Sequence, residues 1–147
     1  MSCKKRAEFK AAVYLLIFDE NGRVLLQKRN GTDFYCGYYG LPSGHMENNE
    51  SSKDSMIREA KEELCIDISP DDLDILMIGH NKSGNYISFV YKCLNYSGVI
   101  QIGEPEKCND LAFFELSKLP ESTIPYIKTW LLEFIPFGIN YSEVYVE

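Results

Sequence analysis

The sequence predicts an α/β fold built on a mixed β-sheet with helices on both of its faces. Three observations lead to this prediction: short apolar runs rich in strand-forming residues, amphipathic helical segments between some of them, and turn-forming residues that separate the segments. With 147 residues, of which 45% are hydrophobic and 25% charged, the chain has the size and composition of an ordinary globular protein. We therefore expect one domain that spans residues 1–147.

The first elements expected are two strands joined by a tight turn. Residues 11–18 and 24–26 are apolar, and the Asn-Gly pair within residues 19–22 tolerates positive φ. This pattern predicts a hairpin with two largely buried strands. Residues 30–44 are rich in glycine and tyrosine, so we expect a loop there with a short strand near residues 38–41.

A helix is expected next, over residues 52–64. Ser51 is a good N-cap, and Asp54 three residues later resembles a capping box with Asp in place of Glu. The buried stripe should come from apolar residues at i, i+3 and i+7, namely Ile57, Ala60 and Leu64. This arrangement would leave the glutamates of the helix on an exposed or site-facing side.

The second half of the chain predicts three strands, a second amphipathic helix and a tail that alternates partly like an edge strand. These segments are, in order, residues 73–79, 86–93 and 111–116 for the strands, 124–134 for the helix and 138–146 for the tail. Because an exposed edge strand offers unpaired backbone groups, residues 141–146 could pair in a homodimer.

Charge and cysteine usage limit the classes of partner. The net charge of −7 argues against a nucleic-acid polymer as partner, and polyphosphate should be repelled unless metal ions neutralise the site. The five cysteines are scattered and form no Cys-x-x-Cys pair, which argues against a zinc site and for free thiols in a reducing compartment. No apolar run approaches the roughly 18 residues that span a bilayer. We expect a cytoplasmic protein with no membrane partner.

Carboxylates form an ordered pattern on the predicted helix. Glu59, Glu62 and Glu63 fall at i, i+3 and i+4 and therefore share one face. Like charges that close destabilise an isolated helix, so we infer that they hold a cation. Clustered hard oxygen ligands favour Mg²⁺ or Mn²⁺ over softer metals. The alternative is a solvated helix face with i, i+4 pairs such as Arg58 and Glu62.

The stretch of residues 44–66 resembles the signature of the Nudix hydrolases. That signature is Gly, five residues, Glu, seven residues, Arg-Glu, an aliphatic residue, any residue, Glu-Glu, any residue, Gly and an aliphatic residue. Six fixed positions match with their spacing intact: Gly44, Glu50, Arg58, Glu59, Glu62 and Glu63. Three positions depart from the pattern, since Cys65 replaces a glycine, Ala60 is small for the aliphatic site and Ser43 replaces a frequent glycine.

The resemblance implies the family's α/β/α sandwich and hydrolysis of a phosphoanhydride bond. By position, the metal ligands would be the backbone carbonyl of Gly44 and the side chains of Glu59, Glu62 and Glu63. Glu62 or Glu59 would also help to activate the attacking water. Arg58 and Glu50 look like catalytic partners that orient these ligands, because Arg can pair with a carboxylate bidentately. The implied cofactor is Mg²⁺ or Mn²⁺, which neutralises phosphate oxygens and lowers the pKa of bound water.

Candidate substrate contacts lie outside the signature. Lys28 and Arg29 end the second strand and could reach phosphate, although such a basic pair is commonly solvated. Aromatic residues before the signature could stack on a nucleobase or pack within the loop, and these are Phe34, Tyr35, Tyr38 and Tyr39. Tyr39 stands where relatives often carry a structural tryptophan. His45, after the loop glycine, is either a surface residue or a catalytic one.

The segment of residues 104–108 is similar to a stretch of MutT-type relatives that cleave nucleoside triphosphates. In those relatives an acidic residue binds metal or contacts the base, and Glu104 or Glu106 could do so here, the alternative being a charged turn before a strand. The sequence therefore favours a MutT-type pyrophosphohydrolase that releases nucleoside monophosphate and pyrophosphate in nucleotide-pool housecleaning. Hydrolysis of ADP-ribose, nucleotide sugars or dinucleoside polyphosphates, or a non-catalytic Nudix binding module, are the alternatives. The module usually loses signature glutamates, and all remain here.

Overall fold

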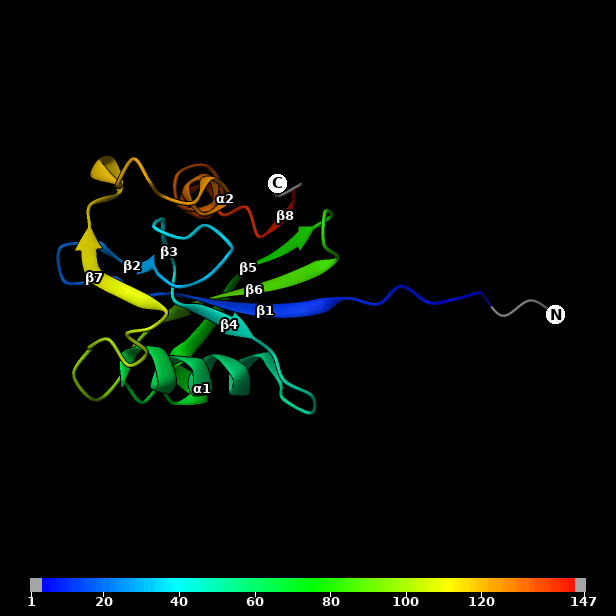
Figure 1. The fold of residues 1–147 in the computed structure, drawn as a ribbon, viewed down its shortest axis with the longest axis horizontal. Helices are drawn as coiled ribbons and strands as arrows, with labels where there is room; N and C mark the ends of the chain where they lie inside the picture. Colours follow the sequence, from blue (N-terminus) through cyan, green and yellow to red (C-terminus); the bar gives the residue numbers. More distant parts are fainter. Residues whose placement is uncertain (1–3, 145–147) are drawn as a thin grey trace.

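The structure, a computed structural model, describes residues 4–144 as two β-sheets flanked by helices (Figure 1). The five-stranded sheet is mixed and has the order β4-β1-β6-β5-β8. Its strands are β4 (Ser43–His45), β1 (Lys10–Leu16), β6 (Tyr86–Cys93), β5 (Leu73–Asn81) and β8 (Tyr141–Val144). The three-stranded sheet is antiparallel, with β3 (Tyr39–Gly40), β2 (Val24–Arg29) and β7 (Cys108–Phe114) in that order. Of the predicted tail, positions 145 and 146 lie outside the described residues.

The predicted hairpin is confirmed only at its turn. The backbone N–H of Leu25 donates to the carbonyl of Ile17 at 2.9 Å, but the two strands then separate into different sheets. β1 pairs with β4 and β6, whereas β2 pairs with β3 and β7. Each strand carries consecutive buried residues and is covered on both faces, so each sits inside a sheet rather than on a two-stranded ribbon.

Helices cover both faces of the five-stranded sheet, as predicted. Figure 1 shows α1 (Ser52–Leu64) on one side and α2 (Pro125–Thr129) on the other. α2 continues into a π-helical turn, η3 (Trp130–Phe134), and shorter turns are η1 (Pro70–Asp72), η2 (Leu116–Lys118) and η4 (Ile135–Phe137). Within residues 4–144, no helix has the length and apolar character needed to cross a bilayer.

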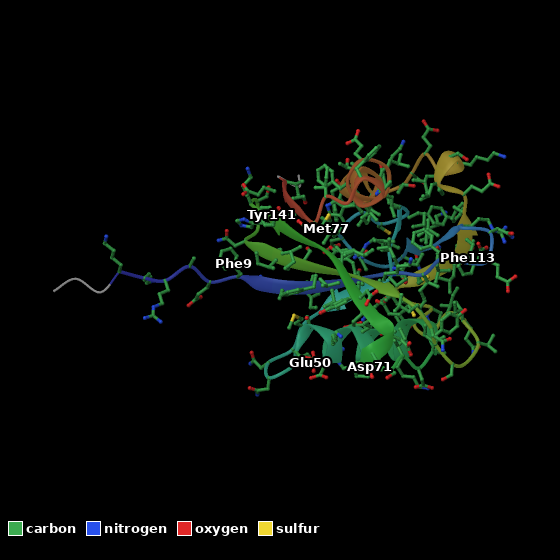
Figure 2. The ribbon with its side chains drawn as sticks, turned by 180° about the vertical axis from the view of Figure 1, so that it is seen from behind. Phe9, Glu50, Asp71, Met77, Phe113 and Tyr141 are labelled. Carbon is green, nitrogen blue, oxygen red and sulfur yellow. The ribbon has the colours of Figure 1, made fainter. Side chains whose placement is uncertain are left out.

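Two apolar cores fill the spaces on either side of the five-stranded sheet. Val13 and Leu15 of β1 belong to the core beneath α1, whereas Leu16 of the same strand belongs to the core beneath α2. This alternation follows from the two-residue period of a strand. Figure 2 shows Met77 of β5 close to the α2 side, where it packs in the core that also contains Trp130.

α1 has the predicted bounds and the predicted cap, but its buried stripe is rotated. The backbone N–H of Asp54 donates to Ser51 Oγ at 3.1 Å, and the return bond completes the capping box. Met56, Ala60 and Leu64 are fully buried, whereas the predicted Ile57 is only partly buried. Glu59 is buried and faces the site, one of the two predicted alternatives, because its side chain is directed at the backbone of β4.

α1 ends at Cys65, which adopts the left-handed conformation with φ 60° and ψ 31°. Its backbone N–H donates to the carbonyl of Lys61 at 3.2 Å and closes the last turn. The helix therefore ends where a glycine would end it, and the side chain of Cys65 carries the steric cost that glycine avoids.

We predict that Cys65→Gly is more stable than Cys65→Ala by about 1 kcal/mol, because only glycine adopts positive φ without strain. Both substitutions remove the thiol, so their difference isolates the backbone effect from lost side-chain packing. Urea unfolding followed by circular dichroism measures the two free energies of unfolding. An alanine variant as stable as the glycine variant would contradict the prediction.

Candidate functional site

The first feature of the site is the close approach of Gly44 in β4 to Glu59 on α1. A Cβ atom added to Gly44 would lie 2.0 Å from Glu59 Cδ and 2.3 Å from Glu59 Oε1. Gly44 has no positive φ, so the glycine is needed for proximity and not for a turn. The absence of a side chain here lets the Glu59 carboxylate approach the backbone of Gly44, as expected if both contribute ligands to one cation.

Arg58 ties the loop before α1 to the carboxylates of the helix. Its guanidinium donates to both oxygens of Glu50, from Nε at 2.7 Å and from Nη2 at 2.9 Å. The same group donates to Glu59 Oε1 at 2.9 Å, to Glu62 Oε2 at 3.3 Å and to the carbonyl of His45 at 3.0 Å. Figure 2 shows Glu50 beside α1, on the side of the sheet opposite α2. The hydrogen bonds from Arg58, followed by one from the backbone N–H of Glu47, lower the pKa of Glu50 to about 2.

The remaining two signature carboxylates have distinct surroundings. Glu63 is partly buried, and Ser43 donates its backbone N–H to Glu63 Oε2 at 3.2 Å. Burial, followed by the negative charge of Glu59, raises the pKa of Glu63 to about 8. Burial also raises the pKa of Glu59, although the hydrogen bond from Arg58 acts in the opposite direction. Both groups therefore favour a nearby cation, which would compensate their charge.

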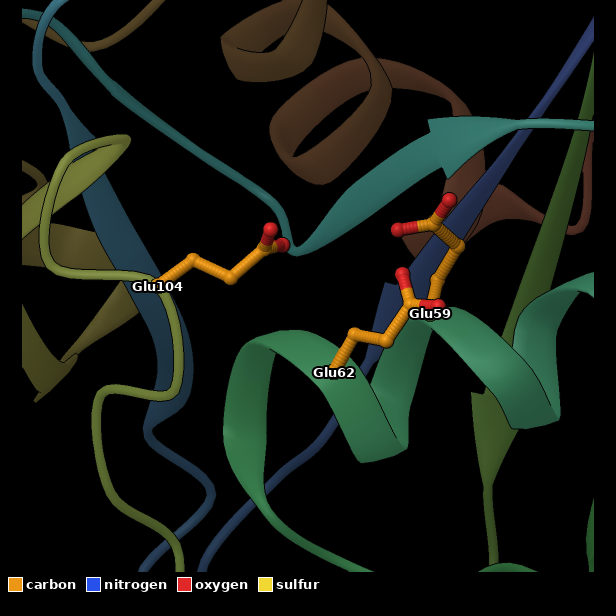
Figure 3. Close-up of side chains that lie close together, drawn as sticks. All are labelled: Glu59, Glu62 and Glu104. Carbon is orange, nitrogen blue, oxygen red and sulfur yellow. The ribbon is translucent and has the colours of Figure 1, made fainter.

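Glu104 reaches the same carboxylates from the loop before β7 (Figure 3). Glu59, Glu62 and Glu104 each place one oxygen within 4.8 Å of the others. Lys107 Nζ lies 3.2 Å from Glu104 Oε2 and pairs with it. This set of hard carboxylate oxygens lies beside the backbone of Gly44, which has no side chain to block a ligand, and it fits Mg²⁺ or Mn²⁺.

The carboxylates open into a cavity of about 570 Å³ between the five-stranded sheet and α2. Its floor contains Ala12, Ser88 and Gly79, which are neighbours in register across β1, β6 and β5. Aromatic side chains form much of its wall: Tyr14, Phe34, Tyr86, Tyr126 and Trp130. The cavity therefore joins an acidic end to a surface on which a flat ring can pack.

Some of the predicted substrate contacts line this cavity and others lie outside it. Arg29 lines it, whereas Lys28, its neighbour on β2, instead places Nζ over the ring of Tyr39 at 6.0 Å. Tyr39 donates its hydroxyl to Asp110 and packs against Phe114, in agreement with a structural position.

The loop residues divide in the same way. Phe34 and His45 line the cavity, but Tyr35 and Tyr38 do not. Glu104 joins the carboxylate cluster, whereas Glu106 is exposed and is not part of it.

The sequence analysis missed several cavity residues. Lys107 was within the segment singled out for its acids, and its charge beside Glu104 was the available signal. Tyr14, Tyr126 and Trp130 sit in strand and helix patterns that also describe core residues. The hydroxyls of Tyr14 and Tyr126 lie 2.9 Å apart, and only the pairing of distant segments brings them together.

Comparisons with known proteins agree with this geometry. The NUDIX domain model matches residues 8–136. An ADP-ribose pyrophosphatase of Methanocaldococcus jannaschii is 28% identical over an alignment of 122 residues, which covers 76% of this chain and 66% of that protein. An 8-oxo-dGTP diphosphatase of Proteus vulgaris is 30% identical over 69 residues, which are 47% of this chain and 59% of that protein. The chain therefore spans less than two thirds of the length of either relative.

A solved structure shows the same fold. The MutT NUDIX hydrolase from Burkholderia pseudomallei superposes with a TM-score of 0.76 at 25% identity, covering 85% of this chain and 97% of that one. The resemblance predicted from residues 44–66 is thus confirmed by a match that extends over most of the chain. We conclude that this chain belongs to the NUDIX family of hydrolases.

Proposed function

We propose that this protein is a metal-dependent nucleotide pyrophosphohydrolase that converts a nucleoside triphosphate to a nucleoside monophosphate and pyrophosphate. One observation carries the proposal: Glu59 and Glu63 line a cavity whose wall is aromatic, and Glu59 also belongs to the carboxylate cluster with Glu62 and Glu104. A nucleotide has the matching division into an anionic tail and a flat base. The four cysteines among the described residues are free, which supports a cytoplasmic location.

The residues have the following roles in this proposal. Glu59, Glu62 and Glu104, with Glu63 and the carbonyl of Gly44, would hold Mg²⁺ or Mn²⁺. Bound metal would neutralise phosphate charge and activate the attacking water. Arg58 and Glu50 orient the helix carboxylates through their mutual hydrogen bonds. The side chain of Glu62 is 48% exposed, so it is more accessible to an attacking water than the buried Glu59.

Binding of the substrate would use the two cations of the cavity wall and the aromatic residues. Arg29 and Lys107 line the cavity and can pair with the phosphates. The small floor formed by Ala12 and Ser88 leaves room for a ring beneath Trp130 and Tyr126. Their neighbouring aromatic edges offer hydrophobic contact without a fixed charge.

ADP-ribose is the second candidate substrate, because a relative that matches 76% of this chain is named as an ADP-ribose pyrophosphatase. ADP-ribose also joins a flat base to an anionic phosphate chain, so its shape and charge suit the same cavity. Nucleotide sugars and dinucleoside polyphosphates belong to the same assay panel, and a non-catalytic binding module would turn over none of these compounds.

The first prediction from this proposed function is metal-dependent turnover that requires Glu62. The chain should release phosphate or pyrophosphate from a panel of ordinary and oxidised nucleoside triphosphates, ADP-ribose, nucleotide sugars and dinucleoside polyphosphates. Glu62→Gln should lower kcat about 100-fold or more, since loss of even an outer partner of a metal ligand costs 10–100-fold. Because Glu62 is exposed, the variant should keep the wild-type circular dichroism spectrum.

Glu121→Gln is the matched control, because Glu121 is an exposed acid outside the cavity lining. Turnover of ADP-ribose alone would keep the metal chemistry and replace the substrate. A wild-type chain inert toward the whole panel would identify a binding module instead.

A second prediction uses Trp130, the single tryptophan of the chain, as a reporter. Its ring lies 5.0 Å from Tyr126 and 5.2 Å from Tyr14 in the cavity wall, so a base that enters should change its fluorescence. Titration of Glu62→Gln with a nucleoside monophosphate should quench emission, whereas inorganic pyrophosphate should leave it nearly unchanged. Equal responses to both compounds would show that the base binds elsewhere.

A third prediction concerns pH and the metal-free protein. Glu63 has an ordinary pKa of 4.5 and a folded-state pKa of about 8, so the folded chain holds its proton more tightly than the unfolded chain. Stability in EDTA should therefore fall as pH rises from about 4.5 to about 8. Thermal unfolding at a series of pH values measures this slope, and Glu63→Gln should flatten it. A wild-type slope equal to that of the variant would contradict the prediction.

A further inference from the structure

The loop that follows β6 is fastened to the C-terminal end of α1 by its backbone. Gln101 donates its N–H to the carbonyl of Leu64 at 3.1 Å, and Gly103 donates its N–H to the carbonyl of Glu63 at 2.9 Å. The last carbonyls of a helix have no partner within the helix. The loop therefore supplies hydrogen bonds that the helix end needs, and its position is fixed relative to the signature carboxylates.

Gly103 makes this approach possible. A Cβ atom at this position would lie 2.0 Å from the carbonyl oxygen of Glu62 and 3.0 Å from its carbonyl carbon. The obstacle is backbone on a rigid helix, which cannot rotate away as a side chain does. Gly103 does not have positive φ, so the loop needs glycine here for closeness alone.

The next residue carries the carboxylate that enters the cluster. Glu104 places an oxygen within 4.8 Å of oxygens of Glu59 and Glu62, and its side chain is only 22% exposed. On its other side, the carbonyl of Glu104 accepts the N–H groups of Lys107 at 2.9 Å and Cys108 at 3.1 Å, where the chain turns into β7. Glu104 is thus held between the end of α1 and the three-stranded sheet.

Electrostatics alone would not keep Glu104 in this place. Glu59 and Glu62 repel it, because like charges at this separation interact unfavourably even near a protein surface. Lys107, which attracts it at 3.2 Å, is exposed, so water weakens this attraction. The backbone bonds of the loop must therefore oppose the repulsion whenever no cation is present.

We propose that Gly103 is a positioning residue of the metal site: its lack of a side chain docks the loop on α1 and so holds the Glu104 carboxylate against Glu59 and Glu62. The inference rests on the proposed function, because the Glu104 carboxylate acts as a ligand only if the site binds a cation. Gly103 itself contributes no ligand. Its effect should pass entirely through Glu104.

The test is a Mn²⁺ titration of the full chain, with free Mn²⁺ measured by electron paramagnetic resonance. Gly103→Ala should lower Mn²⁺ affinity about tenfold, as loss of a supporting partner of a metal ligand does. Glu104→Gln should lower it to a similar extent, and the double variant should bind Mn²⁺ no more weakly than Glu104→Gln. Ile102→Ala, at an exposed neighbour in the same loop, is the control and should bind as the wild type does.

Two results would overturn the inference: a Gly103→Ala chain with wild-type Mn²⁺ affinity, or a further tenfold loss when Gly103→Ala is added to Glu104→Gln. The second result would mean that Gly103 acts on the helix rather than through Glu104. If Gly103→Ala does not fold, Gly98→Ala replaces it in the same comparison. Gly98 has φ +98° and its added Cβ would lie 3.1 Å from the carbonyl of Cys65, so it strains the same docking.

The experiment separates this inference from the proposed function. A wild-type chain that binds Mn²⁺ but hydrolyses nothing in the panel overturns only the proposed function. A chain that hydrolyses nucleotides while Gly103→Ala keeps full Mn²⁺ affinity overturns only the inference. A wild-type chain that does not bind Mn²⁺ overturns both.

Discussion

The guanidinium of Arg58 is the interaction on which the rest of the site depends. It contacts two helix carboxylates, both oxygens of Glu50 and the backbone carbonyl of His45, so it joins the loop before α1 to the helix itself. Removing charges from water is costly, and these hydrogen bonds offset that cost only because several are made at once. Loss of Arg58 would leave Glu59 buried without its partner and would release the loop between β4 and α1, which contains Glu50.

The parts of the structure that were predicted are those in which spacing along the chain decides position in space. The bounds of α1 and its capping box follow from local helix signals, and the pairing of Arg58 with Glu50 joins residues eight positions apart that the family signature places together. The sequence left open whether Glu59 is exposed or faces a site, and its contact with Gly44 shows that it faces the site. That contact joins a strand to a helix, and no periodicity within the helix could reveal it.

The aromatic wall and the separation of the first two strands required tertiary information. Tyr14 and Tyr126 are 112 positions apart, and each is equally suited to a core. Alternation along β2 could have shown that only one of Lys28 and Arg29 faces the cavity, but not which one. Which of the two residues faces the cavity depends on the sheet to which β2 belongs. Strand pairing between distant segments is weakly encoded in any single segment.

Two glycines bring the separate parts of the site within range of each other, and neither is a turn glycine. Gly44 and Gly103 both lack positive φ, and at both positions an added Cβ would lie 2.0 Å from an atom of α1. One brings β4 to the Glu59 side chain, and the other brings the loop before β7 to the Glu62 backbone. Carboxylates from one helix can share a face, but a cation needs ligands from more than one direction. Close backbone approach from two sides is therefore how a single acidic helix becomes part of a three-dimensional site.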